Sequence, residues 1–230
     1  MRYGLCLILI GFCLPVYASS SGVQARYEIS KSGLPLGVIE ETYRQKGTHY
    51  TLTSITTPLG LMAVFKPGKI IIQSQGLVTR QGLSPLFFAD KREQNPEKNT
   101  QVEFDWEAKQ LTLIHPQQRT TLALPDNTQD RLSALYQFHF LNLDNINSLS
   151  FFMTDGRKLD NYYYTLTPQQ KLITPAGVFD TLYLDSTAKP GENRTEIWLD
   201  ATHHLLCKMI ITDGEGGQLT QVLSRLKITP

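Results

Sequence analysis

The chain has 230 residues, with 22 Lys and Arg against 21 Asp and Glu, which gives a formal net charge of +1. Hydrophobic residues make up 41% of the sequence, enough for one sizeable core. Near-neutral charge without long basic runs argues against nucleic acid or an anionic membrane surface as the main partner.

The first 18 residues have the three parts of a secretory signal peptide. Arg2 supplies a positive start, residues 5–14 are apolar, and a small-residue cleavage site ends at Ala18. The apolar run is well short of the ~20 residues that span a bilayer, which argues against a membrane anchor. We expect cleavage after Ala18, release into the periplasm, and a single domain over residues 19–230 that does not span the membrane.

Cleavage would remove Cys6 and Cys13 and leave Cys207 as the only cysteine. The mature chain would then have no intrachain disulfide. Cys207 lies in the alternating apolar run "HLLCKMII", so we expect a buried small hydrophobe and not a reactive thiol.

The dominant hydrophobic period is two, which is typical of β-strands with one buried face. In "TQVEFDW" the side chains of Val102, Phe104 and Trp106 share one face. Similar short runs recur along the chain, separated by turn signals such as Lys46-Gly47 and Asp213-Gly214. Short strands joined by tight turns predict an antiparallel meander.

Two segments interrupt this pattern and predict helices. In "PDNTQDRLSALYQFHFL" (125–141), Asp126 is the expected N-cap and Gln129 completes a capping box. The second is "PLGLMAVFK", from Pro58 to Lys66, with apolar residues on one side. Both segments are too apolar for the outside of a sheet, so we expect the sheet to enclose them.

No motif in the chain indicates catalysis, a metal site or a cofactor. His203 and His204 are neighbours without further ligands at metal spacing, so a solvated turn is the simpler interpretation. There is no Gly-x-Ser-x-Gly sequence, and Glu40 and Glu41 should face opposite sides of a strand. A hydrolase built from residues distant in sequence remains the least favoured alternative.

Several segments together resemble a family of exported bacterial proteins known as domain of unknown function 3108. In order they are "SQGLVTRQGLSPLFFADKR", "VEFDW", "LPDNTQDRLSALYQFHF", "DGRKLDNYYY", "ITPAGVFDTLYL" and "RTEIWLDATHHLLCKMII". The resemblance covers nearly all of the mature chain. It implies a distant likeness to lipoprotein carriers (LolA/LolB-like), which are incomplete antiparallel barrels with helices closing a concave face that accepts acyl chains. No catalytic residue follows from it.

The stretch "SQGLVTRQGLSPLFF" (74–88) is interpreted as a corner in such a wall. Gly76 and Gly82 should bracket a short strand where the backbone bends, and Pro85 should bend or end an edge strand. Phe87 and Phe88 should then point to opposite faces.

The predicted fold is therefore mainly β, a strongly curved antiparallel sheet forming an incomplete barrel that wraps one or two helices. The favoured function is non-enzymatic binding of a lipid, acyl chain or other apolar or amphiphilic ligand in the periplasm. The alternative is an envelope interaction or scaffold protein with a solid core that docks a partner protein. The candidate lining residues are Phe65, Trp106, Tyr136, Phe140 and Trp198, with Arg80 or Arg92 at the rim.

Overall fold

The computed structural model describes residues 20–186 and 193–229, and the predicted signal peptide (1–18) lies outside them. The described residues are mainly β, as predicted, and include two short α-helices, α1 (Leu61–Phe65) and α2 (Ser133–Gln137), and two 3₁₀ segments, η1 (Pro96–Lys98) and η2 (Phe138–Phe140). The strands are β1 (Ser20–Lys31), β2 (Leu34–Lys46), β3 (His49–Pro58), β4 (Ile70–Thr79), β5 (Gly82–Arg92), β6 (Thr100–Asp105), β7 (Gln110–His115), β8 (Gln118–Ala123), β9 (Gln129–Asp130), β10 (Ser148–Thr154), β11 (Leu159–Thr174), β12 (Gly177–Ser186), β13 (Arg194–Asp200), β14 (Leu206–Thr212) and β15 (Gln218–Thr229).

All the described strands belong to one 15-stranded sheet, in the order β8-β7-β6-β5-β4-β3-β2-β1-β15-β14-β13-β12-β11-β10-β9. Its centre is a seam where β1 pairs with β15, with Gly22 opposite Thr229. The seam divides the sheet into an N arm (β1 to β8) and a C arm (β9 to β15). Among the described strands, every pairing is antiparallel except that of β9 with β10, so the sheet is mixed.

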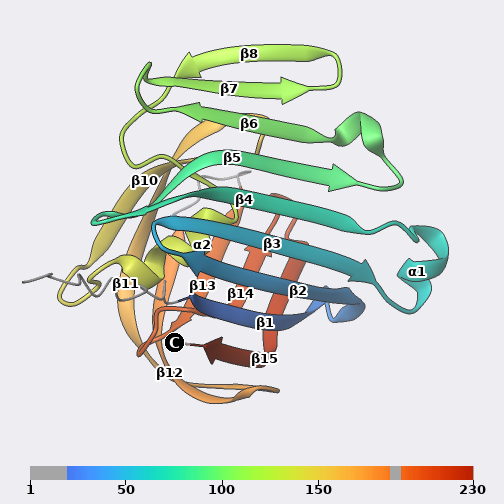
Figure 1. Cartoon of the computed structure of the whole chain (residues 1–230). Helices are drawn as coiled ribbons and strands as arrows, with labels where there is room; N and C mark the ends of the chain where they lie inside the picture. The colour runs from blue at the N-terminus through green and yellow to red at the C-terminus, as the bar shows by residue number, and fades with distance from the viewer. Residues whose placement is uncertain (1–19, 187–192, 230) are drawn as a thin grey trace, which may run out of the picture.

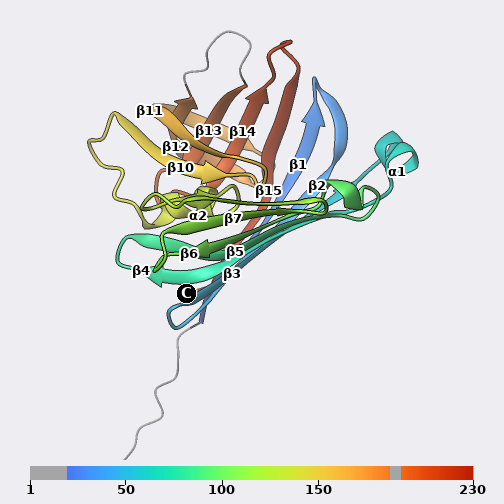
Figure 2. The ribbon, with the colours of Figure 1, turned by 90° about the horizontal axis from the view of Figure 1, so that it is seen from above.

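The arms diverge from the seam, and α2 lies between them (Figures 1 and 2). Among the described strands, the edge strands β8 and β9 do not pair with each other, so the sheet is open. The prediction of an unclosed sheet is confirmed, but the predicted strong curvature is wrong, because the arms diverge and the sheet is not strongly curled. The helical segment 133–140 lies between the arms and packs against both, and the sheet does not encircle it.

Side-chain alternation follows the predicted period. Val102 and Phe104 of β6 are buried while Gln101, Glu103 and Asp105 are exposed. The stretch 74–88 forms the β4–β5 hairpin, and no separate short strand lies between Gly76 and Gly82. The expected irregularity is present, because a β-bulge lies between Gln75 and Gly76.

Two hydrophobic clusters of described residues form the core, one mostly on the N arm and one mostly on the C arm. Tyr43, Leu52 and Phe88 belong to the N-arm cluster, and Leu184 and Leu199 belong to the C-arm cluster. The segment 133–140 joins them: Tyr136 packs in the first cluster, Phe138 in the second, and Leu135 against both. Burial of these three side chains therefore fixes the two arms relative to each other.

The predicted start of the second helix at Asp126 is wrong. Asp126 is exposed and pairs with Lys109, and α2 begins at Ser133. The carboxylate that serves the helix start is that of the buried Asp130, whose Oδ1 accepts the N–H groups of Leu132 (2.9 Å) and Ser133 (2.8 Å). The capping residue is set by strand pairing, because Asp130 is held in β9 opposite Thr154 of β10.

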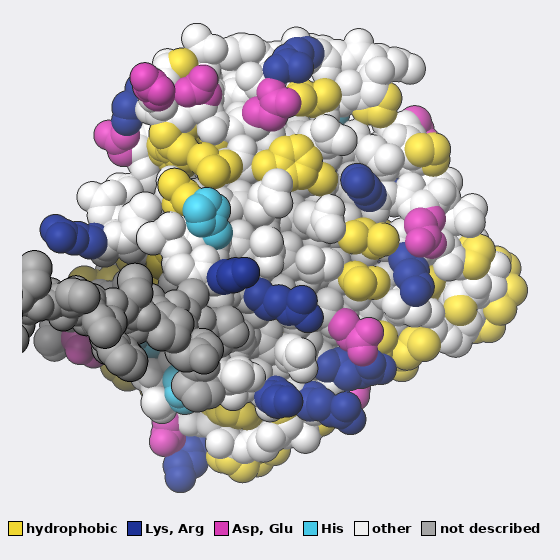
Figure 3. Space-filling view, viewed as in Figure 1, with side chains coloured by type: hydrophobic (Ala, Val, Ile, Leu, Met, Phe, Trp, Pro, Cys, Tyr) yellow, Lys and Arg dark blue, Asp and Glu magenta, His cyan; other side chains and the backbone are white. Residues whose placement is uncertain are grey.

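A helix does form within the predicted segment Pro58–Lys66, but the expectation that it is enclosed is wrong. No residue of α1 is buried, and Leu61, Val64 and Phe65 are 76%, 73% and 76% exposed. A five-residue helix at the outer ends of β3 and β4 is too short to fold back over the sheet. Its side chains join an apolar patch on the surface at this end of the molecule (Figure 3).

Gln137 fastens α2 to the turn between β4 and β5. Its Oε1 accepts the backbone N–H of Leu83 (2.6 Å), and its Nε2 donates to the carbonyl of Gln81 (2.8 Å). The Gln137→Met variant keeps the length of the side chain and loses both bonds, so we expect the free energy of unfolding to fall by about 1–3 kcal/mol. Urea unfolding should show this loss of stability. Gln73→Met is the control, because it makes the same substitution at an exposed site of β4, and it should change the free energy of unfolding little. Equal effects of the two variants would contradict the anchoring role.

Candidate ligand-binding trough

A trough with a volume of about 1100 Å³ lies between the two arms. Strands of both arms supply its walls, and residues at the start of the helical segment 133–140 lie between them. Its apolar lining residues are Ile29, Ile39, Ile70, Ile72, Leu132, Ala134, Leu135, Phe138, Phe151, Met153, Ile197, Met209, Ile211 and Leu219.

Strand periodicity explains why these residues face the trough. Ile70 and Ile72 are two positions apart on β4, as are Met209 and Ile211 on β14, and each pair points to one face of the sheet. All four side chains are half-buried. The walls therefore keep apolar surface accessible, a feature of sites that take apolar or amphiphilic ligands.

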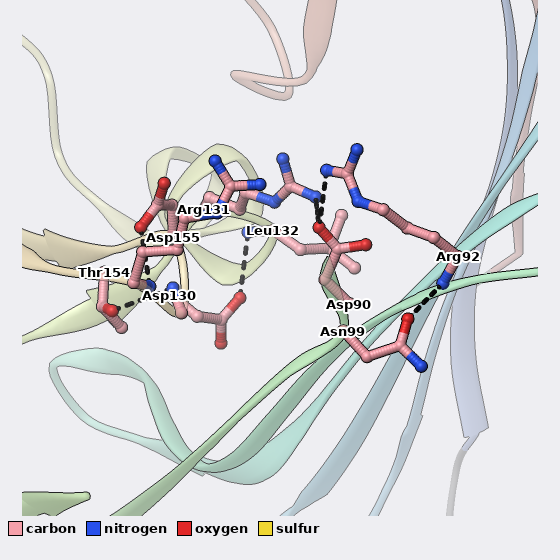
Figure 4. A network of polar contacts seen from close by, with 10 residues as sticks. Asp90, Arg92, Asn99, Asp130, Arg131, Leu132, Thr154 and Asp155 are labelled. Carbon is pink, nitrogen blue, oxygen red and sulfur yellow. Dashed lines mark hydrogen bonds and ion pairs between the residues drawn. The ribbon is translucent and has the colours of Figure 1, made fainter. Parts of the chain in front are cut away.

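One end of the trough carries a charged cluster (Figure 4). Asp90 of β5 is 2% exposed, and its Oδ2 accepts Nη2 of Arg92 (3.0 Å) and Nη2 of Arg131 (2.7 Å). Both arginines line the trough. The cluster thus places two guanidinium groups around one buried carboxylate.

Neighbouring acidic groups already have partners of their own. The Oδ1 of Asp155 accepts the backbone N–H of Arg157 (2.9 Å), and Asp160 pairs with Lys158. Within the described part of the chain, Oδ1 of Asp90 and the Nε atoms of both trough arginines have no hydrogen-bond partner. The protein alone therefore leaves polar atoms of this cluster unsatisfied.

Glu41 of β2 is a second buried acid on the trough wall. Ser54 Oγ and Tyr136 Oη donate to its two carboxylate oxygens, each at 3.2 Å. Burial raises the pKa of Glu41 from 4.5 to about 7, although the two hydrogen bonds act in the opposite direction. Glu40, its neighbour, is exposed and pairs with Arg26, so the two acids do face opposite sides as predicted.

Of the residues expected to line a ligand site, Arg92 lines the trough. Tyr136 does not line the trough but donates a hydrogen bond to Glu41, which does. Its ring stacks on that of Tyr43, with 5.7 Å between the ring centroids. Phe140 packs against the N-arm cluster.

The other candidates lie elsewhere. Trp106 lines a separate shallow depression and donates Nε1–H to the carbonyl of Pro85 (2.7 Å). Trp198 faces away from its trough-lining neighbour Ile197, with Lys208 Nζ 4.9 Å from its ring centroid. Arg80 is exposed in the β4–β5 turn and Phe65 in α1.

Sequence reasoning missed Arg131 and Asp90 because 41 positions separate them, and no local pattern indicates their pairing. It also missed the trough isoleucines, although the period-two pair Ile70 and Ile72 was visible in "KIIIQS". The period-two pattern shows which residues share a face of the strand, but it does not show which face borders an open space.

The described residues contain neither a candidate metal-binding cluster nor a candidate membrane-crossing helix. No group of three or more His, Cys, Asp or Glu among them has an arrangement that could hold a metal ion. None of the helices described is long and apolar enough to cross a membrane. Cys207 is buried, as predicted, and burial raises the pKa of its thiol to about 12.

The raised pKa of Glu41 makes stability depend on pH. The native state holds the proton up to about pH 7, whereas the unfolded chain releases it near pH 4.5. The free energy of unfolding should therefore fall by roughly 3 kcal/mol between these values. Glu41→Gln should remove this component, measured as the difference from the natural protein in urea unfolding at pH 4 to 8. Glu40→Gln should keep the full slope, and a Glu41→Gln profile parallel to the natural one would refute the assignment.

Comparison with solved structures supports the architecture. A beta-barrel-like protein of domain of unknown function DUF1849 from Brucella abortus is 10% identical, with a TM-score of 0.58 over 93% of this chain and 100% of that chain. MucB in the Pseudomonas aeruginosa MucA/MucB complex is 10% identical at a TM-score of 0.31, over 93% of this chain and 53% of that chain. A putative outer membrane lipoprotein-sorting protein domain from Vibrio parahaemolyticus is 10% identical at 0.22, over 91% and 85%. Of these three, the DUF1849 protein has a TM-score above 0.5 and supports the fold.

Sequence comparison addresses the family. No curated protein matches the chain significantly. A family described as "Protein of unknown function (DUF3108)" matches residues 26–223. This range runs from β1 to β15 and includes both arms, α2 and the trough. The resemblance stated from the sequence is confirmed, and the chain belongs to the DUF3108 family.

Proposed function

We propose that this chain is a non-catalytic binding protein of the bacterial periplasm that holds an apolar or amphiphilic ligand, such as a lipid or acyl chain, in its trough. The observation that carries the proposal is the trough itself, about 1100 Å³ and lined on both arms by half-buried aliphatic side chains. The protein leaves this apolar surface in contact with water. A ligand of that kind would bury it, and each Å² of apolar surface buried contributes about 25 cal/mol of favourable free energy.

The alternative of a scaffold protein assumed a solid core, and the trough favours ligand binding over it. The arms of the sheet have filled cores of their own, so the space between them is not needed to complete the packing. Periplasmic location is part of the proposal and rests on the predicted signal peptide.

A neutral probe tests the trough without involving its charges. N-phenyl-1-naphthylamine, whose fluorescence rises in apolar surroundings, should bind the natural protein. Ile70→Asp on the N arm and Ile211→Asp on the C arm should each weaken binding by at least ~10-fold, because a carboxylate in an apolar wall loses hydration when the probe binds.

Phe65→Asp is the matched control, since it makes the same kind of change on the exposed helix α1. It should leave affinity for the neutral probe unchanged. If Phe65→Asp weakens binding while the two trough variants do not, the ligand binds at α1 and the proposal fails. Absence of binding to the natural protein would also reject it.

A further inference from the structure

We propose that Arg92 and Arg131 form a binding site for the anionic headgroup of the ligand, so that the trough selects amphiphiles ending in phosphate or carboxylate. This inference rests on the proposed function and specifies its ligand class. It concerns the charged end of the trough, where both guanidinium groups converge on Asp90 (Figure 4).

The two arginines have spare hydrogen-bonding capacity. Each guanidinium carries five N–H donors in a planar fork that fits oxyanions. Nη2 of each donates to Oδ2 of Asp90. The Nε atoms are buried and have no partner among the described residues, whereas both side chains stay partly exposed. Two guanidinium groups thus contact one carboxylate, and the charge of Asp155 also acts on Arg131. The N–H donors that Asp90 leaves free would bind an added anion.

The backbone holds both arginines in place before any ligand arrives. The N–H of Arg92 donates to Oδ1 of Asn99 (2.8 Å). The N–H of Arg131 donates to the carbonyl of Thr154 (2.9 Å). Because the two side chains come from β5 and from the turn before α2, a bound anion would bridge two separate elements. A site that is already positioned loses little entropy on binding.

The charged cluster adjoins the apolar wall in a fixed register. Arg92 lies opposite Ile70 and Asp90 opposite Ile72 on the paired strands β5 and β4. Directly paired residues of antiparallel strands share a face of the sheet. The wall therefore passes from aliphatic to cationic within one strand pair, which suits a molecule with an apolar chain joined to an anionic end.

The test uses probes that share one chain and differ in headgroup. Dodecyl phosphate and dodecanol, both kept below their aggregation concentrations, are titrated against bound N-phenyl-1-naphthylamine. We expect the natural protein to bind dodecyl phosphate at least ~10-fold more tightly than dodecanol, the effect of one good charge-assisted contact. Arg92→Gln and Arg131→Gln should each reduce this preference, with dodecanol affinity unchanged.

Arg80→Gln is the matched control, because it removes the same charge from an exposed turn outside the trough lining. It should keep the full preference. Arg131→Gln leaves the buried Asp90 with one partner, so Arg131→Lys is measured as well. Arg131→Lys retains the positive charge but lacks the planar guanidinium donors. It should keep only part of the preference for dodecyl phosphate over dodecanol.

The outcomes separate the two proposals. Equal affinity of the natural protein for both dodecyl probes would overturn the headgroup site and leave the apolar trough standing. If the fluorophore does not bind and neither dodecyl probe competes with it, both the headgroup site and the ligand-binding trough are overturned. If inorganic phosphate displaces dodecyl phosphate at a similar concentration, the arginines bind a free anion, and the headgroup assignment is wrong.

Discussion

The packing of one short helical segment against both halves of the sheet is the interaction on which the molecule depends. Tyr136 and Phe138 enter different clusters, and Leu135 touches both. The segment is too short to be a stable helix by itself, so its shape comes from tertiary contacts, chiefly the buried carboxylate of Asp130 at its start and the Gln137 side chain at its end. Because these contacts hold the segment between the arms, they also keep the trough open.

The trough combines two environments that have different physical origins. Its aliphatic walls follow from strand alternation and need only the right face to point inward. Its charged end requires a specific long-range arrangement, since Asp90 and Arg131 come from β5 and from the turn before α2. Buried charges of this kind are costly unless paired, and here the pairing is incomplete. A protein optimised for stability alone would gain by closing this end with apolar groups, and the proposed headgroup site is our account of the charges there.

The sequence predicted what depends on local pattern and failed where distant residues decide the outcome. Alternation at Val102 and Phe104 placed the strand faces correctly, and the mainly β class followed. The helix start was assigned to Asp126 because capping rules are local, whereas strand pairing with β10 puts Asp130 there. Trp198 was proposed as a lining residue because aromatic character suggests burial, but its strand presents Ile197 to the trough. No rule based on residue type can tell which face of a strand borders open space.

The pairing of β1 with β15 has a consequence for how the chain reaches its final form. Gly22 and Thr229 are neighbours in space, so the central contact joins the first and the last of the described strands. The hairpins of the first arm can form as they are synthesised, but the sheet is completed only when the last strand arrives, and such distant pairings form slowly. Until β15 pairs, β1 has β2 as its single neighbour and exposes an unpaired edge. Removal of β15 would separate the sheet into β1 to β8 and β9 to β14.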